Sequence, residues 1–245
     1  MGKFLWVGIL LFLCGEAAAF HPLVSEDTVF LGKDGRQLEC ALDHAVFKEG
    51  RDKYSTTASA ELSYGLFESL DVLITVPWQG WRSHGISESG LGDVLTEVKF
   101  PLGTKSGWDL ALKPGFSLPA GDEAKSLGAG EGGAWIYGIA GRVRGPWRIY
   151  LNAGYLYNRN SLEEEKNIFK GSAAAAYGFL PEWKVTAELA VETNHEKNAV
   201  SHPVFCGWGV VWAPLQSLSL DAGLRVGLTR PAADLDLLGA ITLRL

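Results

Sequence analysis

Strict two-residue alternation between apolar and polar side chains runs through most of this chain and constrains its fold more than any other feature. In residues 218–229, for example, Leu, Ala and Val side chains occupy every second position and polar or small ones stand between them. A helix would repeat every 3.6 residues, so this pattern predicts strands. The segments with the clearest alternation are 54–64, 70–78, 94–102, 108–118, 147–157, 183–192 and 218–229.

Weaker segments at similar spacing bring the predicted number of strands to twelve. They cover residues 37–46, 134–143, 169–179, 204–213 and 235–245. An even number of strands of about ten residues each is typical of bacterial outer-membrane barrels. The predicted fold class is therefore all-β, a transmembrane antiparallel up-and-down β-barrel of about 12 strands over residues 37–245.

The predicted connections alternate between short and long. Five have at most five residues: Gly65–Ser69, Gly103–Gly107, Arg144–Pro146, Leu180–Glu182 and Pro214–Ser217. Four run to eleven or twelve: Gln79–Gly90, Asp122–Gly133, Asn158–Ile168 and Thr193–Pro203. Two further external loops, near Lys48–Lys53 and Arg230–Asp234, are shorter. Short periplasmic turns and long external loops characterise outer-membrane barrels, whereas a β-sandwich has no reason to alternate in this way.

Residues 1–19 are predicted to be a secretory signal peptide. A short basic start precedes the eleven apolar residues Phe4–Cys14, and Ala17 and Ala19 occupy the −3 and −1 positions of a cleavage site. Eleven apolar residues are too few to span a hydrocarbon core of roughly 30 Å as a helix, which disfavours a retained anchor. A lipoprotein modified at Cys14 is disfavoured because Leu13 stands where a small residue is needed. We expect export and location in the outer membrane of a diderm bacterium.

The composition argues against several other classes of protein. The net charge of −6 disfavours nucleic acid as a partner, because nucleic-acid binding proteins present basic surfaces. Cleavage leaves two cysteines, Cys40 and Cys206, which lie on strands too far apart around the barrel for a disulfide. His195, Glu196 and His202 share one loop and are interpreted as solvated side chains rather than metal ligands. We expect no metal and no cofactor.

Several short stretches resemble a known family. They are Phe20–Thr28, Gly90–Val94, Leu118–Asp122 and Leu218–Thr229, which are similar to the outer-membrane β-barrel transporter family of the MetA-pathway of phenol degradation type. Membership would imply an outer-membrane barrel that passes hydrophobic aromatic compounds. The chain departs from the family pattern at Ser25–Glu26, where Thr-Asp is usual, and at Leu245, which replaces a terminal aromatic residue. Its alternating C-terminal end resembles an assembly signal read by the barrel-insertion machinery.

Strand parity predicts which charged side chains line the lumen. They are Glu61, Asp93, Glu97, Lys99, Asp109, Lys113, Arg142, Arg148, Lys184, Glu188, Asp221, Arg225 and Arg244. Because both signs are interleaved, no strong ion selectivity is expected. The same charges could pair with one another and close the pore, since a buried charge needs a partner. An open or gated pore and a closed lumen both remain compatible with the sequence.

Two functions follow from these alternatives. The first is an outer-membrane channel or transporter for small solutes, with hydrophobic aromatic compounds implied by the family resemblance. The second is a structural or adhesion barrel with a closed lumen, whose acidic loop Glu163–Glu165 would meet divalent cations and lipopolysaccharide. The expected partners are outer-membrane lipid, lipopolysaccharide, the insertion machinery and a solute, and we expect a monomer.

A membrane-embedded enzyme is disfavoured. Such a hydrolase needs a Ser nucleophile, a His base and an orienting Asn or Asp. His84, His195 and His202 fall in predicted external loops, and His21 and His44 have no suitable Ser nearby. We therefore predict no catalytic residues.

The stretch Phe20–Arg36 lacks strand alternation, and two placements are open for it. It could fold into the lumen as a plug and pair with lumen charges such as Arg225 and Arg244, using His21, Glu26 and Asp27. Alternatively, it hangs disordered in the periplasm, as terminal segments often do.

Overall fold

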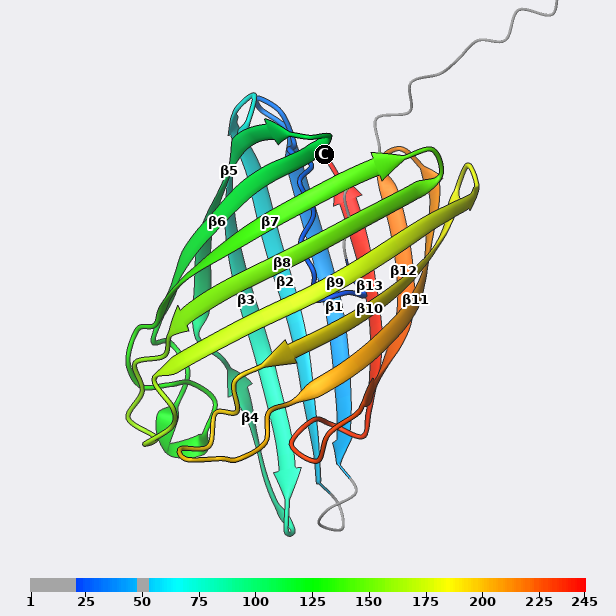
Figure 1. Ribbon diagram of the computed structural model, residues 1–245. Coiled ribbons are helices and arrows are strands. Elements are labelled where there is room, and N and C mark those ends of the chain that lie inside the picture. Colours follow the sequence, from blue (N-terminus) through cyan, green and yellow to red (C-terminus); the bar gives the residue numbers. More distant parts are fainter. Residues whose placement is uncertain (1–20, 48–52) are drawn as a thin grey trace, which may run out of the picture.

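The computed structural model describes residues 21–47 and 53–245, and most of them belong to one antiparallel sheet (Figure 1). The strands are β1 (Arg36–Phe47), β2 (Lys53–Phe67), β3 (Leu70–Ser83), β4 (Ile86–Leu91), β5 (Val94–Lys105), β6 (Trp108–Leu118), β7 (Ala134–Arg144), β8 (Trp147–Tyr157), β9 (Asn167–Leu180), β10 (Trp183–Glu192), β11 (Val204–Leu215), β12 (Leu218–Gly227) and β13 (Leu235–Arg244). A short 3-10 helix, η1 (Glu123–Lys125), lies in the loop after β6.

The sheet closes into a barrel because the first strand pairs with the last. β1 pairs with β13 on one side and with β2 on the other, and each later barrel strand pairs with its neighbours in sequence. This is the predicted up-and-down topology. Closure pairs both long edges of the sheet, as a barrel surrounded by lipid requires, and only the short segment β4 is paired on one side alone.

Thirteen strand segments make twelve barrel strands. β4 pairs with the distal half of β3, from Trp78 to Ser83, and β5 pairs with the proximal half, from Asp71 to Thr75. Gly92 and Asp93 interrupt what is otherwise one long strand opposite β3. The predicted count of twelve is therefore confirmed.

The prediction of a long loop over residues 79–90 is wrong. β3 and β4 continue through this region and meet at a tight turn, where His84 and Gly85 both have positive φ, 52° and 80°. The sequence hides these strands because residues 86–90 mix Ile86 with Glu88 and Gly90 on one face and carry only serines on the other. Alternation is visible only where one face of a strand is apolar.

The other predicted connections agree with the structure. Two-residue turns join the strands at the end where both β1 begins and β13 ends, and Ser106–Gly107 combines two positive φ values, 54° and 76°. That geometry suits the right-handed twist of a hairpin. Longer loops gather at the opposite end, over residues 119–133, 158–166 and 193–203 (Figure 1). Of the two shorter external loops, the one near Lys48–Lys53 falls largely outside the described residues.

Burial is the reverse of that in a soluble protein. Leu62, Leu151 and Leu237 are about half exposed on the outer face, whereas Glu97, Lys113 and Glu188 are buried inside. Aromatic side chains lie at the strand ends, as in the stacked pair Trp183 and Trp212, whose ring centroids are 5.6 Å apart. An apolar outer band with aromatic rims matches a bilayer. Within the described residues, no helix is long and apolar enough to cross a membrane.

The two cysteines that follow the predicted signal peptide are unpaired. Cys40 lies on β1 and Cys206 on β11, with β13 and β12 between them, and both are free thiols. Three strand spacings of about 4.8 Å exceed the roughly 7 Å Cα separation that a disulfide tolerates. The predicted absence of a Cys40–Cys206 bond is thus confirmed.

Candidate functional site

Residues 21–35, called here the lumen segment, run through the interior of the barrel before β1 begins (Figure 1). The later end is tied to the β2–β3 turn region by backbone hydrogen bonds. The Asp34 N–H donates to the Gly65 oxygen, and the Gly65 N–H donates to the Gly35 oxygen, each at 2.8 Å. The earlier end reaches side chains of β1 and β12 deeper in the lumen. The segment is thus held near both of its ends.

Glu188 on β10 receives the segment through a cluster of hydrogen bonds. Its carboxylate accepts from the Val24 N–H at 3.1 Å, the Ser25 N–H at 2.7 Å and the Ser25 hydroxyl at 2.6 Å. The Ser25 hydroxyl is also 2.7 Å from that of Ser172 on β9. Glu188 is buried, and donors to a carboxylate form the stronger class of hydrogen bond. Within the described residues no cation pairs with Glu188, so these hydrogen bonds fix the segment at this point.

Two lysines hold the middle of the segment. The Lys113 ammonium is 2.5 Å from a Glu26 carboxylate oxygen and 3.0 Å from one of Glu97. The Lys99 ammonium is 2.7 Å from Asp27. Burial would raise the pKa of Glu26, but the ammonium groups of Lys113 and Lys99 outweigh it and lower that pKa below its ordinary value. Glu26 is accordingly held as a carboxylate.

One amide side chain, that of Asn152, forms hydrogen bonds with both backbone groups of Glu26. Asn152 on β8 accepts from the Glu26 N–H at 2.6 Å and donates to the Glu26 carbonyl at 3.1 Å. A segment without secondary structure must satisfy its backbone groups with side chains or water. Asn152 satisfies two of them and sets the depth of the segment.

His21 bridges two carboxylates at the deep end. Its Nδ1 atom is 2.5 Å from Asp221 on β12, and its Nε2 atom is 3.0 Å from Asp43 on β1. Burial lowers the pKa of His21, but the hydrogen bonds and charges of Asp221 and Asp43 raise it to about 9. Both ring nitrogens therefore carry protons near neutral pH, and the imidazolium ties two strands to the segment.

Small residues in the wall make room for the segment. A Cβ atom at Gly209 would overlap the ring of Pro22, and one at Gly141 would overlap the side chain of Thr28. Both glycines lie on strands whose neighbouring positions hold larger side chains. Glycine at these two positions lets the backbone of the wall approach the segment closely.

Of the predicted lumen residues, Lys99, Lys113, Glu188 and Asp221 contact the lumen segment directly. Glu97 contacts it through Lys113, and Arg225 pairs with Asp43 and Asp236 at 3.5 and 3.1 Å. Six other predicted lumen residues lie at inward-facing positions of the strands or directly beside a strand: Glu61, Asp93, Asp109, Arg148, Lys184 and Arg244. Asp93 accepts from the Gly121 and Ala129 N–H groups and so anchors the loop after β6. Asp109 is exposed near the turn before β6, where Thr104 donates to it.

The placement of Arg142 in the lumen is wrong. Along β7, Ile139 is 2% exposed and faces inward, whereas Ile136 is 44% exposed on the outer face. Arg142 shares the face of Ile136, and its guanidinium lies 5.9 Å from the ring centroid of Trp108. The sequence does not reveal this parity because β7 carries large apolar side chains on both faces, Ile136 outside and Ile139 inside.

The expected partners of the segment also need correction. His21, Glu26 and Asp27 do not pair with Arg225 and Arg244. The carboxylates pair with Lys113 and Lys99, and His21 acts as a cation between carboxylates. Strand parity predicts which side chains face the lumen, but not how far along the barrel axis each one lies. The ion pairs of the segment depend on that position.

Several lumen residues were missed from the sequence. They lie on β1 and β3 or in positions without charge: Gln37, Glu39, Asp43, Asp71, Tyr150 and Asn152. On β1, the signal was weak because Cys40 and His44 interrupt its apolar face. Parity counted from Gln37 would have found Glu39 and Asp43.

A closed barrel with an apolar exterior and a polar interior defines a transmembrane β-barrel protein. A family model described as "Putative MetA-pathway of phenol degradation" matches residues 52–245. The chain therefore belongs to that family. No curated protein matches the sequence.

Solved structures share the fold. An outer membrane channel from Pseudomonas putida F1 is 14% identical with a TM-score of 0.72, covering 89% of this chain and 98% of that one. The NanC porin is 9% identical with a TM-score of 0.60, covering 85% and 100%. The CymD monoaromatic hydrocarbon channel is 10% identical with a TM-score of 0.50, covering 86% and 88%. At these identities the likeness concerns the fold.

Proposed function

We propose that this protein is an outer-membrane channel for small solutes and that the lumen segment is its plug. The observation that carries the proposal is the way in which residues 21–35 are held. They form no strand of the sheet and are retained by side-chain contacts with Glu188, Lys113, Lys99 and Asp221. Such contacts can be exchanged for water, whereas strand pairing would lock the segment into the wall.

The size of the barrel supports the same function. Eight strands enclose only a side-chain-filled interior, and sixteen or more leave an open aqueous channel. Twelve strands lie between these cases, so a short inserted segment is enough to occlude the lumen. Displacement of the plug would open a narrow path along charges of both signs.

We propose small hydrophobic aromatic compounds as the solutes. This class is supported by the description of the family and by the channel for monoaromatic hydrocarbons that shares the fold. Uptake by proteoliposomes of toluene-like compounds compared with sugars tests it. Faster uptake of sugars would contradict this choice of solute.

The other proposed properties follow from membrane insertion. The signal peptide is removed on export, the barrel is inserted as a monomer by the insertion machinery, and lipid and lipopolysaccharide surround it. No enzymatic role is proposed. The alternative, a structural or adhesion barrel with a permanently closed lumen, differs from the channel in one measurable way: it never conducts.

A reversible cross-link tests the plug. In a Cys40→Ala and Cys206→Ala background, Ser25→Cys and Ser172→Cys would replace two hydroxyls that are 2.7 Å apart. We expect the oxidised protein to stay closed in planar bilayers and to regain channel openings after reduction. Equal conductance in both states would contradict a plug that moves.

Deletion of residues 20–34 provides a second test. We expect conductance to rise several-fold, because the lumen loses its only inserted segment among the described residues. Heat-modifiable gel mobility checks that the barrel is folded. If the correctly inserted deletion variant conducts no more than the native chain, residues 20–34 are not a plug. If neither the variant nor the native chain conducts at all, the result favours the structural barrel with a permanently closed lumen.

A further inference from the structure

Three cationic side chains, called here the rim cations, point away from the lumen at the end of the barrel that carries the short turns. Arg142 and Arg144 on β7 have the outward parity of Ile136, which is 44% exposed. Lys105, the last residue of β5, stands directly opposite Trp108 of β6 in the strand register. Because opposite residues of a ladder share one face of the sheet, Lys105 faces outward with Trp108. The Arg142 guanidinium, 5.9 Å from the centroid of the Trp108 ring, lies on that same face.

A β-bulge decides the face of Lys105. The register between β5 and β6 shifts between Pro101 and Gly103, so that β5 contains one extra residue there. Lys99 is buried on the lumen side, and without the shift Lys105 would have the same parity. Bulges redirect the side chains that follow them. This one brings a third cation to the outer face beside the two arginines.

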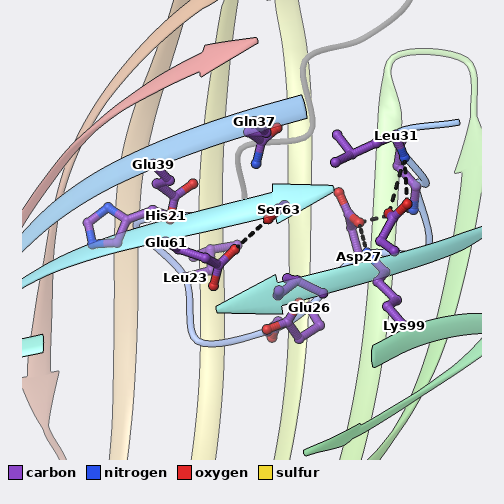
Figure 2. A pocket seen from close by; sticks show the side chains of 14 residues that line it. His21, Leu23, Glu26, Asp27, Leu31, Gln37, Glu39, Glu61, Ser63 and Lys99 are labelled. Carbon is purple, nitrogen blue, oxygen red and sulfur yellow. Dashed lines mark hydrogen bonds and ion pairs between the residues drawn. The ribbon is translucent and has the colours of Figure 1, made fainter. Parts of the chain in front are cut away.

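The protein supplies no counter-ion for this group. Strands β5 to β8 contain two carboxylates, Glu97 and Asp109, and both have the parity of the lumen face. The β5–β6 and β7–β8 turns contain no acidic residue. Within the part of the chain that the structure describes, no rim cation forms an ion pair. The lumen differs, since the ammonium of Lys99 is 2.7 Å from Asp27 (Figure 2).

Aromatic side chains place the rim cations at the boundary between lipid and water. Trp108 and Trp147 begin β6 and β8 directly after the two turns, and the Trp147 ring centroid is 4.8 Å from that of Tyr177 on β9. Girdles of such residues lie at the level of the lipid headgroups. Farther along β8 the outer face is apolar, with Ile149 39% and Leu151 46% exposed. A lipid beside this wall therefore meets positive charge at its headgroup and apolar surface along its chains.

Arg142 is positioned to bind a phosphate group. Its guanidinium lies against the Trp108 ring and beside the turn at Gly107, where a Cβ atom would be 3.8 Å from one of its nitrogens. An unpaired charge on the lipid face costs free energy, and the cost is smallest near the interface. The planar guanidinium can donate two hydrogen bonds to one phosphate group. A lipid phosphodiester would thus supply the negative charge that the chain lacks here.

The charge is confined to one end of these strands. At the other end, the outward positions carry only uncharged side chains, including Phe116, Leu118, Ile136 and Tyr157. The end with short turns faces the periplasm in outer-membrane barrels. The periplasmic leaflet of an outer membrane consists of phospholipids, whereas lipopolysaccharide occupies the external leaflet. The rim cations therefore lie at the level of phospholipid headgroups.

We propose that the rim cations bind an anionic phospholipid of the periplasmic leaflet, with its phosphodiester against Arg142 and its acyl chains along β6 to β8. Lys105 and Arg144 flank the phosphodiester. They favour lipids with a net negative charge over zwitterionic lipids, whose own ammonium group they repel. The site requires only that the barrel is inserted in the membrane. It does not depend on whether the barrel conducts or the lumen segment moves.

Native mass spectrometry of the full mature chain tests this preference. The protein is released from detergent micelles that contain equal amounts of phosphatidylglycerol and phosphatidylcholine with the same acyl chains. A cation at a lipid surface favours anionic lipid by about fivefold, so we expect phosphatidylglycerol to be retained at least about fivefold more often than phosphatidylcholine. Equal retention of the two lipids would overturn the proposal.

Two soluble competitors separate a lipid site from a site for free phosphate. Glycerophosphoglycerol has the same headgroup without acyl chains, and inorganic phosphate is the simplest anion of this class. Both are added in separate experiments at constant ionic strength. We expect neither to displace phosphatidylglycerol, because neither gains contact with the apolar wall. Complete displacement by either would assign the rim cations to a soluble phosphate compound and overturn the lipid site.

Variants locate the site. The triple variant Lys105→Gln, Arg142→Gln and Arg144→Gln keeps polar side chains of similar length and should reduce the preference for phosphatidylglycerol to less than about twofold. Arg142→Lys keeps the charge but not the planar fork and should weaken the preference by a smaller factor. A triple variant that is folded, as judged by heat-modifiable gel mobility, and keeps the full preference would overturn the proposal. Should it fail to fold, Arg142→Lys and the comparison of lipids on the unmodified chain still decide the question.

The matched control is Arg36→Gln at the same end of the barrel. Arg36 on β1 lies 5.9 Å from the ring centroid of Tyr64, as Arg142 does from Trp108. It differs in its surroundings, because the Tyr64 hydroxyl donates to the Asp34 carboxylate at 2.8 Å. We expect Arg36→Gln to keep the preference for phosphatidylglycerol. An equal loss in Arg36→Gln and in the triple variant would show that the overall charge of the barrel, and not this site, attracts the lipid.

Discussion

The Nδ1 atom of His21 lies 2.5 Å from the Oδ1 atom of Asp221, a residue 200 positions later in the sequence. This contact fixes the deep end of the lumen segment to β12, while Asp34 and Gly35 fix its other end to Gly65. The two ends of the plug are held by different kinds of contact, a charged hydrogen bond at His21 and backbone hydrogen bonds at Gly65. The two ends can therefore be released separately. The contact of His21 with Asp221 and Asp43 is strongest when the imidazole is protonated.

Raising the pH should loosen the deep end of the plug. The pKa of His21 is raised from 6.5 to about 9 when the segment is seated. The stabilisation from its charge is therefore complete below about pH 6.5 and is lost as the pH rises through 9, and it is on the order of 3 kcal/mol. We expect channel openings and amide exchange in residues 21–27 to increase between pH 7 and 10.

The control for this pH dependence is His21→Gln. The charged groups around the imidazole are Asp43 and Asp221, with Arg225 next to Asp43 and Glu39 near it on β1. Glutamine keeps hydrogen bonding but has no charge to lose, so its profile should lack the rise that loss of the imidazolium charge causes over this range. A variant profile as steep as that of the native chain would assign the effect to another group.

Removing the charge of Lys113 should release the middle of the plug. Lys113→Met leaves the partly exposed Glu26 and the buried Glu97 without their shared ammonium group, and breaking a buried ion pair from one side costs about 3–5 kcal/mol. We expect faster amide exchange across residues 24–31 and higher conductance. Lys170→Met is the matched control, because Lys170 pairs with Glu192 and forms no ion pair with residues 21–35 of the lumen segment. Equal effects of both variants would indicate general weakening of the barrel.

The signal peptide should be removed after Ala19, which leaves Phe20 one residue before the His21 tie. This cleavage site lies outside the described residues and rests on Ala17, Ala19 and the apolar run before them. We expect the intact mass of protein from outer-membrane fractions to match residues 20–245. Ala19→Leu should retain the leader. A native chain that begins at Met1 or Cys14 would show that the site is wrong.

The barrel could be predicted from the sequence because a strand with one lipid face and one polar face shows its alternation directly. Prediction failed where this contrast disappears. β4 has one large apolar side chain on each face, Ile86 and Leu91, and so shows no contrast, and β7 has isoleucines on both faces, which reversed the position of Arg142. The sequence suggested that residues 20–36 could enter the lumen, but their partners could not be predicted. Contacts such as Lys113 with Glu26 depend on the relative depth of distant strands.

Adding one methyl group at Gly209 should displace the plug without altering the outer face of the barrel. A Cβ atom there would overlap the Pro22 ring, and its next neighbours, the Thr186 hydroxyl and the Ala222 oxygen, would be 3.0 and 3.1 Å away. Because the wall is held by strand pairing on both sides, the lumen segment is the part that can move. Gly209→Ala should therefore weaken the contacts of His21 and Glu188 with the segment, raising amide exchange at Val24 and Ser25 and increasing conductance. Gly239→Ala is the matched control, since its Cβ would meet nothing closer than the Asp221 oxygen at 3.6 Å. Unchanged exchange at Val24 and Ser25 in a folded Gly209→Ala barrel would mean that the segment does not rest against this wall.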